Sequence, residues 1–422
     1  MDRRLFLLSG LAGVADPVTP VVTSTLKATA PPAPVTQSGD AEFDAWSQSF
    51  VARTVAAGWP EAVLRGALAG LTPDPLVVAA DRKQPEFTRS IGDYMHAAVS
   101  DNRVATGRQK TAEVAAWLDM IQTRYGVDGA VLVGIWALES GFGVAQGDFD
   151  VVRSLATLAA DGRRRGWAES ELLASLRIMA ANAATRAQLK GSWAGAMGQT
   201  QLEPSEYVAK AVDIDGDGRA DIWGSPADAL GSSANILALA GWTRGASWAR
   251  EVLLPPGFDY SLTEGPKNPP AWWTALGVRR TDGADWSPVD AGSACGLIVP
   301  AGAAGPAFLV FPNHFVIRTY NNSTSYALAV GLMADGVSGQ PPLVTAWPVE
   351  APISQADRTG AQAALIKLGF DPGGADGVIG TKTRAALRSW QASRKLVADG
   401  HLTAQLAATL QLEAGTDGPP VH

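Results

Sequence analysis

The stretch AVLVGIWALESGFG, residues 130–143, decides the fold of this chain. From Ala130 the run is apolar nearly all round until it ends at Glu139, and it is too long for a typical strand. We therefore predict a helix that is buried on every side. The Gly141-Phe142-Gly143 turn follows at once and places Glu139 where the chain leaves the core.

The position of Glu139 indicates acid chemistry. A carboxyl group that emerges from a buried helix is partly withdrawn from water, and desolvation raises its pKa because the charged form loses hydration. A general acid that works near neutral pH requires such a raised pKa. The alternative is a water-exposed Glu at a helix C-terminus, where the helix dipole disfavours its charge.

Further helices are predicted on both sides of this stretch. Upstream, apolar residues at i, i+4, i+7 and i+11 form one helical face: Val114, Leu118, Ile121 and Tyr125. Gly126 ends that helix. Downstream, helical patterns cover residues 169–189 and 227–241. The chain from about residue 42 to 333 is therefore expected to be mainly α-helical.

Three segments lack a helical pattern. Residues 254–312 are punctuated by Pro and Gly, and we expect an irregular insertion there with short strands at 296–300 and 308–311. Residues 16–40 and 335–353 are rich in Pro and small residues and are predicted to be linkers.

Residues 1–15, MDRRLFLLSGLAGVA, have the pattern of an export signal. The paired Arg3 and Arg4 before a short apolar run resemble a twin-arginine signal. No Cys follows, which excludes a lipoprotein anchor, and no other segment approaches the ~18–20 apolar residues of a membrane span. We expect a soluble protein exported to the periplasm.

Composition excludes several classes of function. Hydrophobic residues make up 46% and charged residues 18%, which is typical of a globular protein. The net charge of −7, with no basic stripe, argues against a nucleic-acid or anionic-membrane partner. A single cysteine, Cys295, allows neither an intramolecular disulfide nor a cysteine-based zinc site. The four histidines are far apart, so a metallohydrolase is not expected.

Three blocks resemble, in the right order, the membrane-bound lytic murein transglycosylase B family. They are IWALESGFG at 135–143, which is similar to the catalytic-glutamate motif, GSWAGAMGQTQ at 191–201 and YNNSTSYALAV at 320–330. The resemblance implies a lysozyme-like catalytic domain over residues 41–334.

The resemblance also implies roles for individual residues. It makes Glu139 the catalytic acid, hydrogen-bonded by Ser192, and it implies a substrate-binding set: Ser192, Met197, Gln201, Tyr320, Asn321 and Tyr326. For Met197, packing in the core is the alternative. One departure is visible, because Leu202-Glu203 stands where the family often has Phe-Met.

The implied reaction needs one carboxyl group. Glu139 would protonate the bridging oxygen of the MurNAc–GlcNAc β-1,4 bond of peptidoglycan while the substrate's N-acetyl group stabilises the oxocarbenium-like centre. The resulting carboxylate would take the proton of the C6 hydroxyl, which closes onto C1 as a 1,6-anhydro product without water. We expect no cofactor in the chemistry, peptidoglycan glycan strands as partner, and a monomer.

Two alternatives remain from the residues alone. Ordinary glycosidases use two carboxyl groups, and Asp148 or Asp150 could hold a water in a lysozyme-like muramidase. For both residues, loop solvation or helix capping is the simpler role. The other alternative is a non-catalytic wall-binding protein, against which the retained Glu139 argues.

An acidic loop, DIDGDGRAD at 213–221, follows the calcium-loop pattern, with Gly at the sixth position. The twelfth position is Gly224 rather than Glu, and Asp228 is a candidate for the missing ligand. The predicted metal set is Asp213, Asp215, Asp217, Arg219, Asp221 and Asp228. We predict a calcium ion that stabilises the fold; the alternative is an acidic turn without metal.

The C-terminal segment, residues 354–412, combines Leu365, Leu368 and Phe370 with the turn Asp376-Gly377 and a second helical face that ends in Trp390. It resembles the small three-helix peptidoglycan-binding domain. The resemblance implies that this domain raises the local concentration of the catalytic domain at the cell wall.

Overall fold

The structure is a computed structural model that describes residues 35–82 and 89–416. The predicted export signal and most of the predicted first linker lie outside the described residues. Within these ranges, no helix combines the length and apolar character needed to cross a bilayer.

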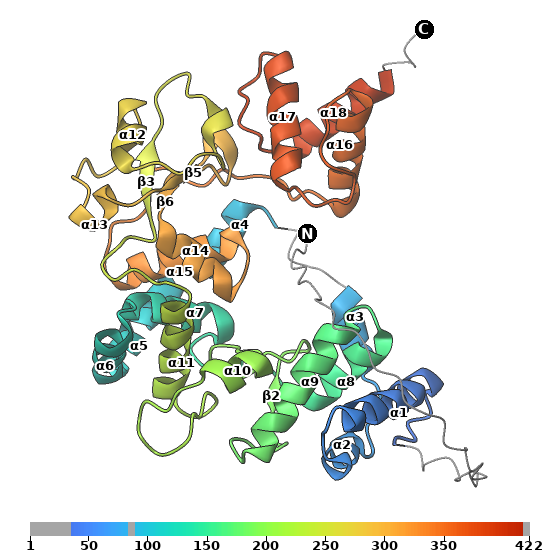
Figure 1. Ribbon diagram of the computed structural model, residues 1–422. Coiled ribbons are helices and arrows are strands. Elements are labelled where there is room, and N and C mark those ends of the chain that lie inside the picture. Colours follow the sequence, from blue (N-terminus) through green and yellow to red (C-terminus); the bar gives the residue numbers. More distant parts are fainter. Residues whose placement is uncertain (1–34, 83–88, 417–422) are drawn as a thin grey trace, which may run out of the picture. The chain divides into compact units, whose positions relative to one another are not determined.

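Helices dominate the part of the chain that precedes the insertion (Figure 1). They are α1 (Ala41–Ala56), α2 (Glu61–Leu68), α3 (Pro75–Arg82), α4 (Ile91–Ala98), α5 (Asp101–Glu113), α6 (Ala115–Tyr125), α7 (Gly129–Ser140), α8 (Val151–Asp161), α9 (Arg165–Ala180), α10 (Pro204–Lys210) and α11 (Pro226–Leu239). Two short strands, β1 (Phe149–Asp150) and β2 (Lys190–Gly191), pair antiparallel. The predicted mainly α-helical fold is confirmed.

Helix α7 is the predicted buried helix, and it lies at the centre of one hydrophobic core. It packs against α15 (Thr324–Val337) at very short range. A Cβ atom at Gly134 would lie 2.7 Å from the carbonyl oxygen of Val330, which belongs to α15. Only glycine allows this approach, so Gly134 sets the distance between α7 and α15.

A second core lies around α8, α9 and α1. Figure 1 shows the two groups of helices, α5–α7 with α11, α14 (Pro312–Tyr320) and α15 on one side and α1, α2, α8 and α9 on the other, with α10 between them. Helix α11 contributes Leu230 and Leu237 to the first core and Ala229 and Ile236 to the second. It therefore joins the two halves.

The insertion contains a four-stranded antiparallel sheet with the strand order β4-β3-β6-β5. The strands are β3 (Ala249–Leu253), β4 (Arg279–Arg280), β5 (Gly296–Ile298) and β6 (Ala307–Val310), and the short helices between them are η2 (Tyr260–Leu262), α12 (Pro270–Ala275), α13 (Pro288–Ala291) and η3 (Gly302–Ala304). The two predicted strands are present as β5 and β6. Strand β3 was missed because it precedes the Pro-rich pattern and carries two charged residues.

One predicted helix boundary is wrong, and residues of the predicted second linker make tertiary contacts. The helix expected over 169–189 is α9, which ends at Ala180, and Asn182 then takes a left-handed backbone with φ 53°. The second predicted linker is partly packed: α15 continues to Val337, and Trp347 stacks on Phe308 with ring centroids 6.2 Å apart. A local sequence pattern does not predict such tertiary contacts, because they join residues that are far apart in the chain.

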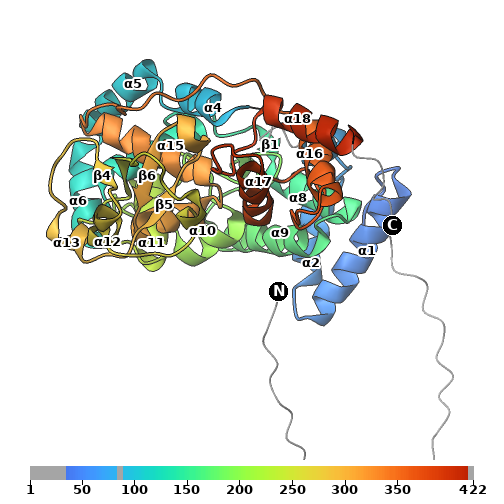
Figure 2. The same cartoon turned by 90° about the horizontal axis from the view of Figure 1, so that it is seen from above.

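The C-terminal segment forms three helices, as predicted. They are α16 (Gln355–Lys367), α17 (Thr381–Ser393) and α18 (Ala404–Thr416), and both views show them grouped together (Figures 1 and 2). Leu365, Leu387, Trp390 and Leu410 fill their own small core.

Candidate active site

Helix α7 ends in a turn with three successive left-handed residues. Phe142 lies between Gly141 and Gly143, with φ of 65°, 58° and 85° respectively. A residue with a side chain is uncommon in this conformation. The Phe142 ring packs edge-on against Trp136, 5.7 Å between centroids, and this contact offsets the strain. The turn is therefore held in one conformation directly after Glu139.

A hydrogen-bond network also holds this turn in place. The Ser140 hydroxyl donates to the carbonyl oxygen of Gln199 (2.5 Å) and accepts from the backbone N–H of Gly143 (2.7 Å). The buried Gln199 side chain accepts from Trp136 Nε1 (3.0 Å) and donates to the carbonyl oxygen of Trp223 (3.2 Å). Gln199 thus joins the end of α7 to the residues around Trp223.

Glu139 is half-buried and takes one strong hydrogen bond. The Tyr326 hydroxyl, on α15, donates to Glu139 Oε1 at 2.6 Å. Burial raises the pKa of Glu139 to about 7, and the bond from Tyr326 opposes the rise because it stabilises the carboxylate. Burial also raises the pKa of Tyr326 well above its usual range, so Tyr326 remains a donor. A proton is therefore available on Glu139 near neutral pH.

Tyr320 ties three elements together beside this carboxyl. Its hydroxyl donates to the carbonyl oxygen of Thr200 (2.6 Å) and lies 3.1 Å from the hydroxyl of Ser233 on α11. Burial, and secondarily the charge of Glu139, raise the pKa of Tyr320. Tyr320 thus stays neutral and links α14, α11 and the 191–201 block.

The structure separates the other predicted substrate-binding residues. The Ser192 hydroxyl accepts from the backbone N–H of Ala196 (3.1 Å), and the Tyr326 hydroxyl donates to Glu139. Met197 is fully buried in the second core, and its backbone pairs with that of Leu202.

Gln201 and Asn321 remain accessible to different degrees. Gln201 is half-buried with a left-handed backbone (φ 53°), and its amide donates to the carbonyl oxygens of Gln146 and Gly198, both at 2.9 Å. Asn321 is exposed at the end of α14.

The carboxylates after Glu139 have structural partners. Asp150 caps α8 through the backbone N–H of Arg153 (3.0 Å) and pairs with Arg186 (2.8 Å). Asp148 is exposed. These contacts favour the capping role over a water-holding role for Asp150.

The comparison with known families is decisive. A family model described as "Transglycosylase SLT domain" matches residues 42–335. The chain belongs to this family. A second model, "Putative peptidoglycan binding domain", matches residues 354–410 behind the transglycosylase domain. The resemblance predicted from the three sequence blocks is confirmed.

Several relatives share this transglycosylase domain. The membrane-bound lytic murein transglycosylase B of Escherichia coli (strain K12) is 33% identical over 223 residues, which is 51% of this chain and 58% of that protein. The match thus spans little more than half of the curated relative. SltB3 from Pseudomonas aeruginosa, solved with NAG-anhNAM-pentapeptide, is 44% identical with a TM-score of 0.84 and covers 88% of this chain and 100% of that one.

The acidic loop of the transglycosylase domain gathers three carboxylates. Oxygens of Asp213, Asp215 and Asp217 lie within 4.8 Å of one another. Hard oxygen donors at this spacing fit Ca²⁺. Asp228 lies outside this group: it is buried, and its two oxygens accept the backbone N–H groups of Ile214 (2.7 Å) and others nearby. It braces the loop.

Asp221 and Arg219 also have other contacts. Asp221 accepts the backbone N–H of Trp223 (3.0 Å), while the guanidinium of Arg219 donates to the carbonyl oxygen of Ala183 (3.1 Å). A relevant relative is Slt35 of Escherichia coli, solved in complex with calcium, which is 27% identical with a TM-score of 0.60 and covers 69% of this chain and 92% of that one.

Sequence reasoning missed Gln199 and Ser140. Both lie inside the quoted blocks, but nothing in the pattern distinguishes the Gln199 amide from that of Gln201 two residues later. The signal was the pair of polar residues within otherwise apolar, Gly-rich segments, because a buried amide must find partners.

Proposed function

We propose that this chain is a lytic transglycosylase that cleaves the MurNAc–GlcNAc β-1,4 bond of peptidoglycan and leaves 1,6-anhydro-MurNAc ends, with Glu139 as acid and then base. The observation that carries the proposal is the single half-buried carboxyl of Glu139, with a pKa of about 7 and one donor, Tyr326. The family match and the muropeptide complexes of SltB3 support it.

The hydrogen bond from Tyr326 divides the work between the two carboxyl oxygens. Because Oε1 accepts the Tyr326 hydroxyl, the acid proton resides on Oε2 and can pass to the glycosidic oxygen. The C1–O bond then breaks, the leaving GlcNAc takes the proton, and Tyr326 stabilises the new carboxylate. Glu139 next accepts the C6 hydroxyl proton as O6 bonds to C1, which restores the acid.

This route explains why a second catalytic carboxylate is not needed. The substrate's N-acetyl group can stabilise the positive centre at C1, and the nucleophile is the sugar's own hydroxyl. Asp150, one of the two alternative carboxylates, is engaged by Arg186 and by its helix cap. A hydrolytic muramidase is therefore the less favoured reaction.

Product analysis tests the proposal. Purified sacculi are digested with the wild-type chain and with Glu139→Gln, and the released muropeptides are analysed by mass spectrometry. We expect anhydro ends from the wild type and no release from Glu139→Gln, with unchanged circular dichroism. Reducing ends would establish hydrolysis, and an active Gln variant would remove Glu139 from the mechanism.

We also propose that the loop at 213–228 binds a calcium ion that stabilises the fold without entering the chemistry. The three clustered carboxylates and the calcium complex of Slt35 support this role. Asp213, Asp215 and Asp217 would hold the ion. We propose further that residues 1–15 direct export to the periplasm, by the twin-arginine route, and that the protein acts there as a monomer.

The domain division that accompanies this function is a transglycosylase domain at 41–334 and a peptidoglycan-binding domain at 354–412. The two family matches, at 42–335 and 354–410, support these boundaries. The binding domain would retain the enzyme on its polymeric substrate between cleavage events.

A further inference from the structure

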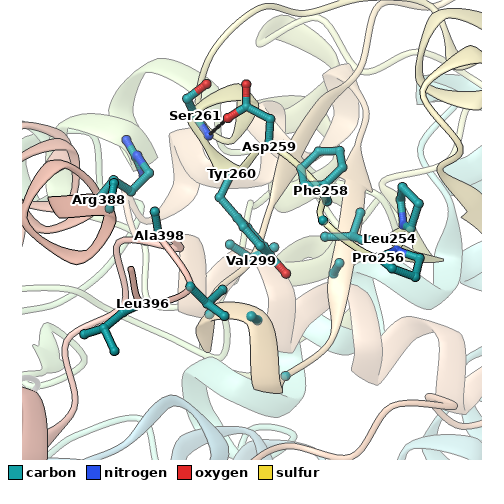
Figure 3. A pocket seen from close by; sticks show the side chains of 18 of the residues that line it. Leu254, Pro256, Phe258, Asp259, Tyr260, Ser261, Val299, Arg388, Leu396 and Ala398 are labelled. Atoms are coloured by element: carbon teal, nitrogen blue, oxygen red, sulfur yellow. Dashed lines mark hydrogen bonds between the residues drawn. The ribbon is translucent and has the colours of Figure 1, made fainter. Parts of the chain in front are cut away.

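A large groove lies away from Glu139, where the insertion meets the C-terminal three-helix unit. It has a volume of about 860 Å³, within the range of pockets that bind small ligands and peptides. The loop after β3 and Val299 form one wall, and the end of α17 with the loop that follows it forms the other. Figure 3 shows Arg388, Leu396 and Ala398 opposite Leu254, Pro256 and Phe258.

Polar contacts hold the two walls together beside the groove. Arg384 pairs with Glu264 (2.5 Å), and the Asp399 carboxylate accepts the backbone N–H of Ala303 (2.9 Å). The join is tight, because a Cβ atom at Gly302 would lie 2.5 Å from Asp399 Oδ2. Both walls are therefore needed to form the groove.

The groove exposes several large apolar side chains. Three of the side chains that line it are exposed to solvent: Leu253 at 50%, Leu396 at 46% and Val397 at 58%. Phe258 packs edge-on against Tyr260 in the same wall, 5.5 Å between centroids. Clustered apolar groups of this kind mark a surface that binds something.

One cation lies among these apolar groups. Among the described residues that line the groove, Arg388 is the only Lys or Arg, and Asp259 on the other wall is the only Asp or Glu. Its guanidinium makes one long hydrogen bond, 3.4 Å to Thr263 Oγ1, and no ion pair within the described part of the chain. A half-buried guanidinium with free donors is suited to a carboxylate.

We propose that this groove binds the peptide stem of peptidoglycan, with the apolar wall receiving its small side chains and Arg388 pairing with a peptide carboxylate. This inference rests on the proposed function, which makes peptidoglycan the substrate. In intact peptidoglycan the lactyl carboxyl group of MurNAc is held in an amide bond with the peptide, so the free carboxylates belong to the peptide. The apolar wall and the cation together therefore select the peptide. The ligand in the SltB3 complex carries such a pentapeptide.

The proposal differs from a general attraction to the cell wall. The groove needs residues of both the transglycosylase domain and the C-terminal unit, so the site exists only in the whole chain. A peptide bound there would hold a strand at a second point while another part of it lies at Glu139, which raises the effective concentration of the cleavable bond.

The test is a sedimentation assay with the full-length chain carrying Glu139→Gln, which leaves the polymer intact. Binding is measured to purified sacculi and to glycan strands that have been stripped of their peptides by an amidase. The lactyl carboxyl groups that the amidase exposes are then amidated, so that no carboxylate remains on these strands. Arg388→Gln removes the charge, and Lys382→Gln, on the same helix α17 but not lining the groove, is the matched control. Ala398→Phe fills the groove without changing its charge.

We expect Arg388→Gln to weaken binding to sacculi about tenfold, the loss of one charge-assisted contact. Ala398→Phe should weaken it as well, whereas Lys382→Gln should not, and all variants should bind stripped strands equally. Equal affinity of Arg388→Gln and Lys382→Gln for sacculi, or an equal loss on stripped strands, would overturn the proposal. Failure of the proposed reaction would appear separately, as absence of anhydro products from the wild-type chain.

Discussion

The end of α7 and the loop at 213–221 use the same functional group in opposite environments. Glu139 is one half-buried carboxyl with a raised pKa and a single donor, Tyr326. In the loop, Asp215 and Asp217 are exposed to water and lie with Asp213 in one cluster. Burial favours the protonated form of Glu139, whereas clustered oxygen donors at the surface suit a hard cation.

The two regions are physically connected. The Gln199 side chain accepts a hydrogen bond from Trp136 near the end of α7. It donates another to the carbonyl oxygen of Trp223. Trp223 in turn donates its backbone N–H to Asp221 of the acidic loop. Catalysis is therefore expected at the end of α7, and stabilisation of the fold at the loop 213–221.

The largest effect is expected at Glu139 itself. Glu139→Asp keeps a carboxyl group but withdraws it by one methylene, and a displacement of about 1 Å costs on the order of 100-fold in kcat. Steady-state release of anhydromuropeptides measures this loss. Glu61→Asp, a surface carboxylate that pairs with Arg65, is the control and should leave kcat unchanged. A nearly active Glu139→Asp would argue against acid catalysis at this position.

The next effect is expected from the donor to Glu139. Glu139 must be protonated to act first as an acid, so kcat should fall as the pH rises through about 7. Tyr326 lowers the pKa of Glu139, and Tyr326→Phe should therefore move this fall to higher pH while reducing kcat about tenfold, since the carboxylate loses its donor. A pH–rate profile measures both. A fall that moved to lower pH would contradict the assigned hydrogen bond.

A smaller effect is expected at Gln199, which positions Glu139 without touching substrate. Gln199→Met keeps the length of the side chain and removes its bonds to Trp136 and Trp223. We expect kcat to fall several-fold, roughly the effect of one lost hydrogen bond of about 1 kcal/mol, with KM unchanged. Gln188→Met, on an exposed turn, is the control. A change in KM alone would assign Gln199 to binding instead.

The smallest effect on catalysis is expected at the acidic loop. Calcium at about 100 times its Kd would stabilise the folded state by about 2.7 kcal/mol, so chelation should lower the melting temperature by several degrees. Asp217→Asn should lower it without added chelator and leave kcat within about twofold. A melting temperature insensitive to both changes would show that the loop is an acidic turn without metal.

Sequence reasoning worked best where one local pattern was long and uniform. The apolar run at 130–139 predicted α7 and placed Glu139 at its end, because a helix that is apolar all round has no stable place except a core. It was weaker at 169–189, where the residue pattern favours a helix up to 189 although α9 ends at Ala180. It missed β3, whose alternation is short and partly charged.

Three features could be predicted from the sequence alone: the helical class, the buried run before Glu139 and the cluster of acidic residues at 213–221. Each depends on residues that are close to one another along the chain. Tertiary structure decided that Tyr326, 187 positions away, donates to Glu139, that Ser192 turns to Ala196, and that Met197 enters the core. The physical reason is reach: hydrogen bonds and burial act between atoms that the fold brings within a few ångströms, and that proximity is a property of packed helices rather than of local pattern.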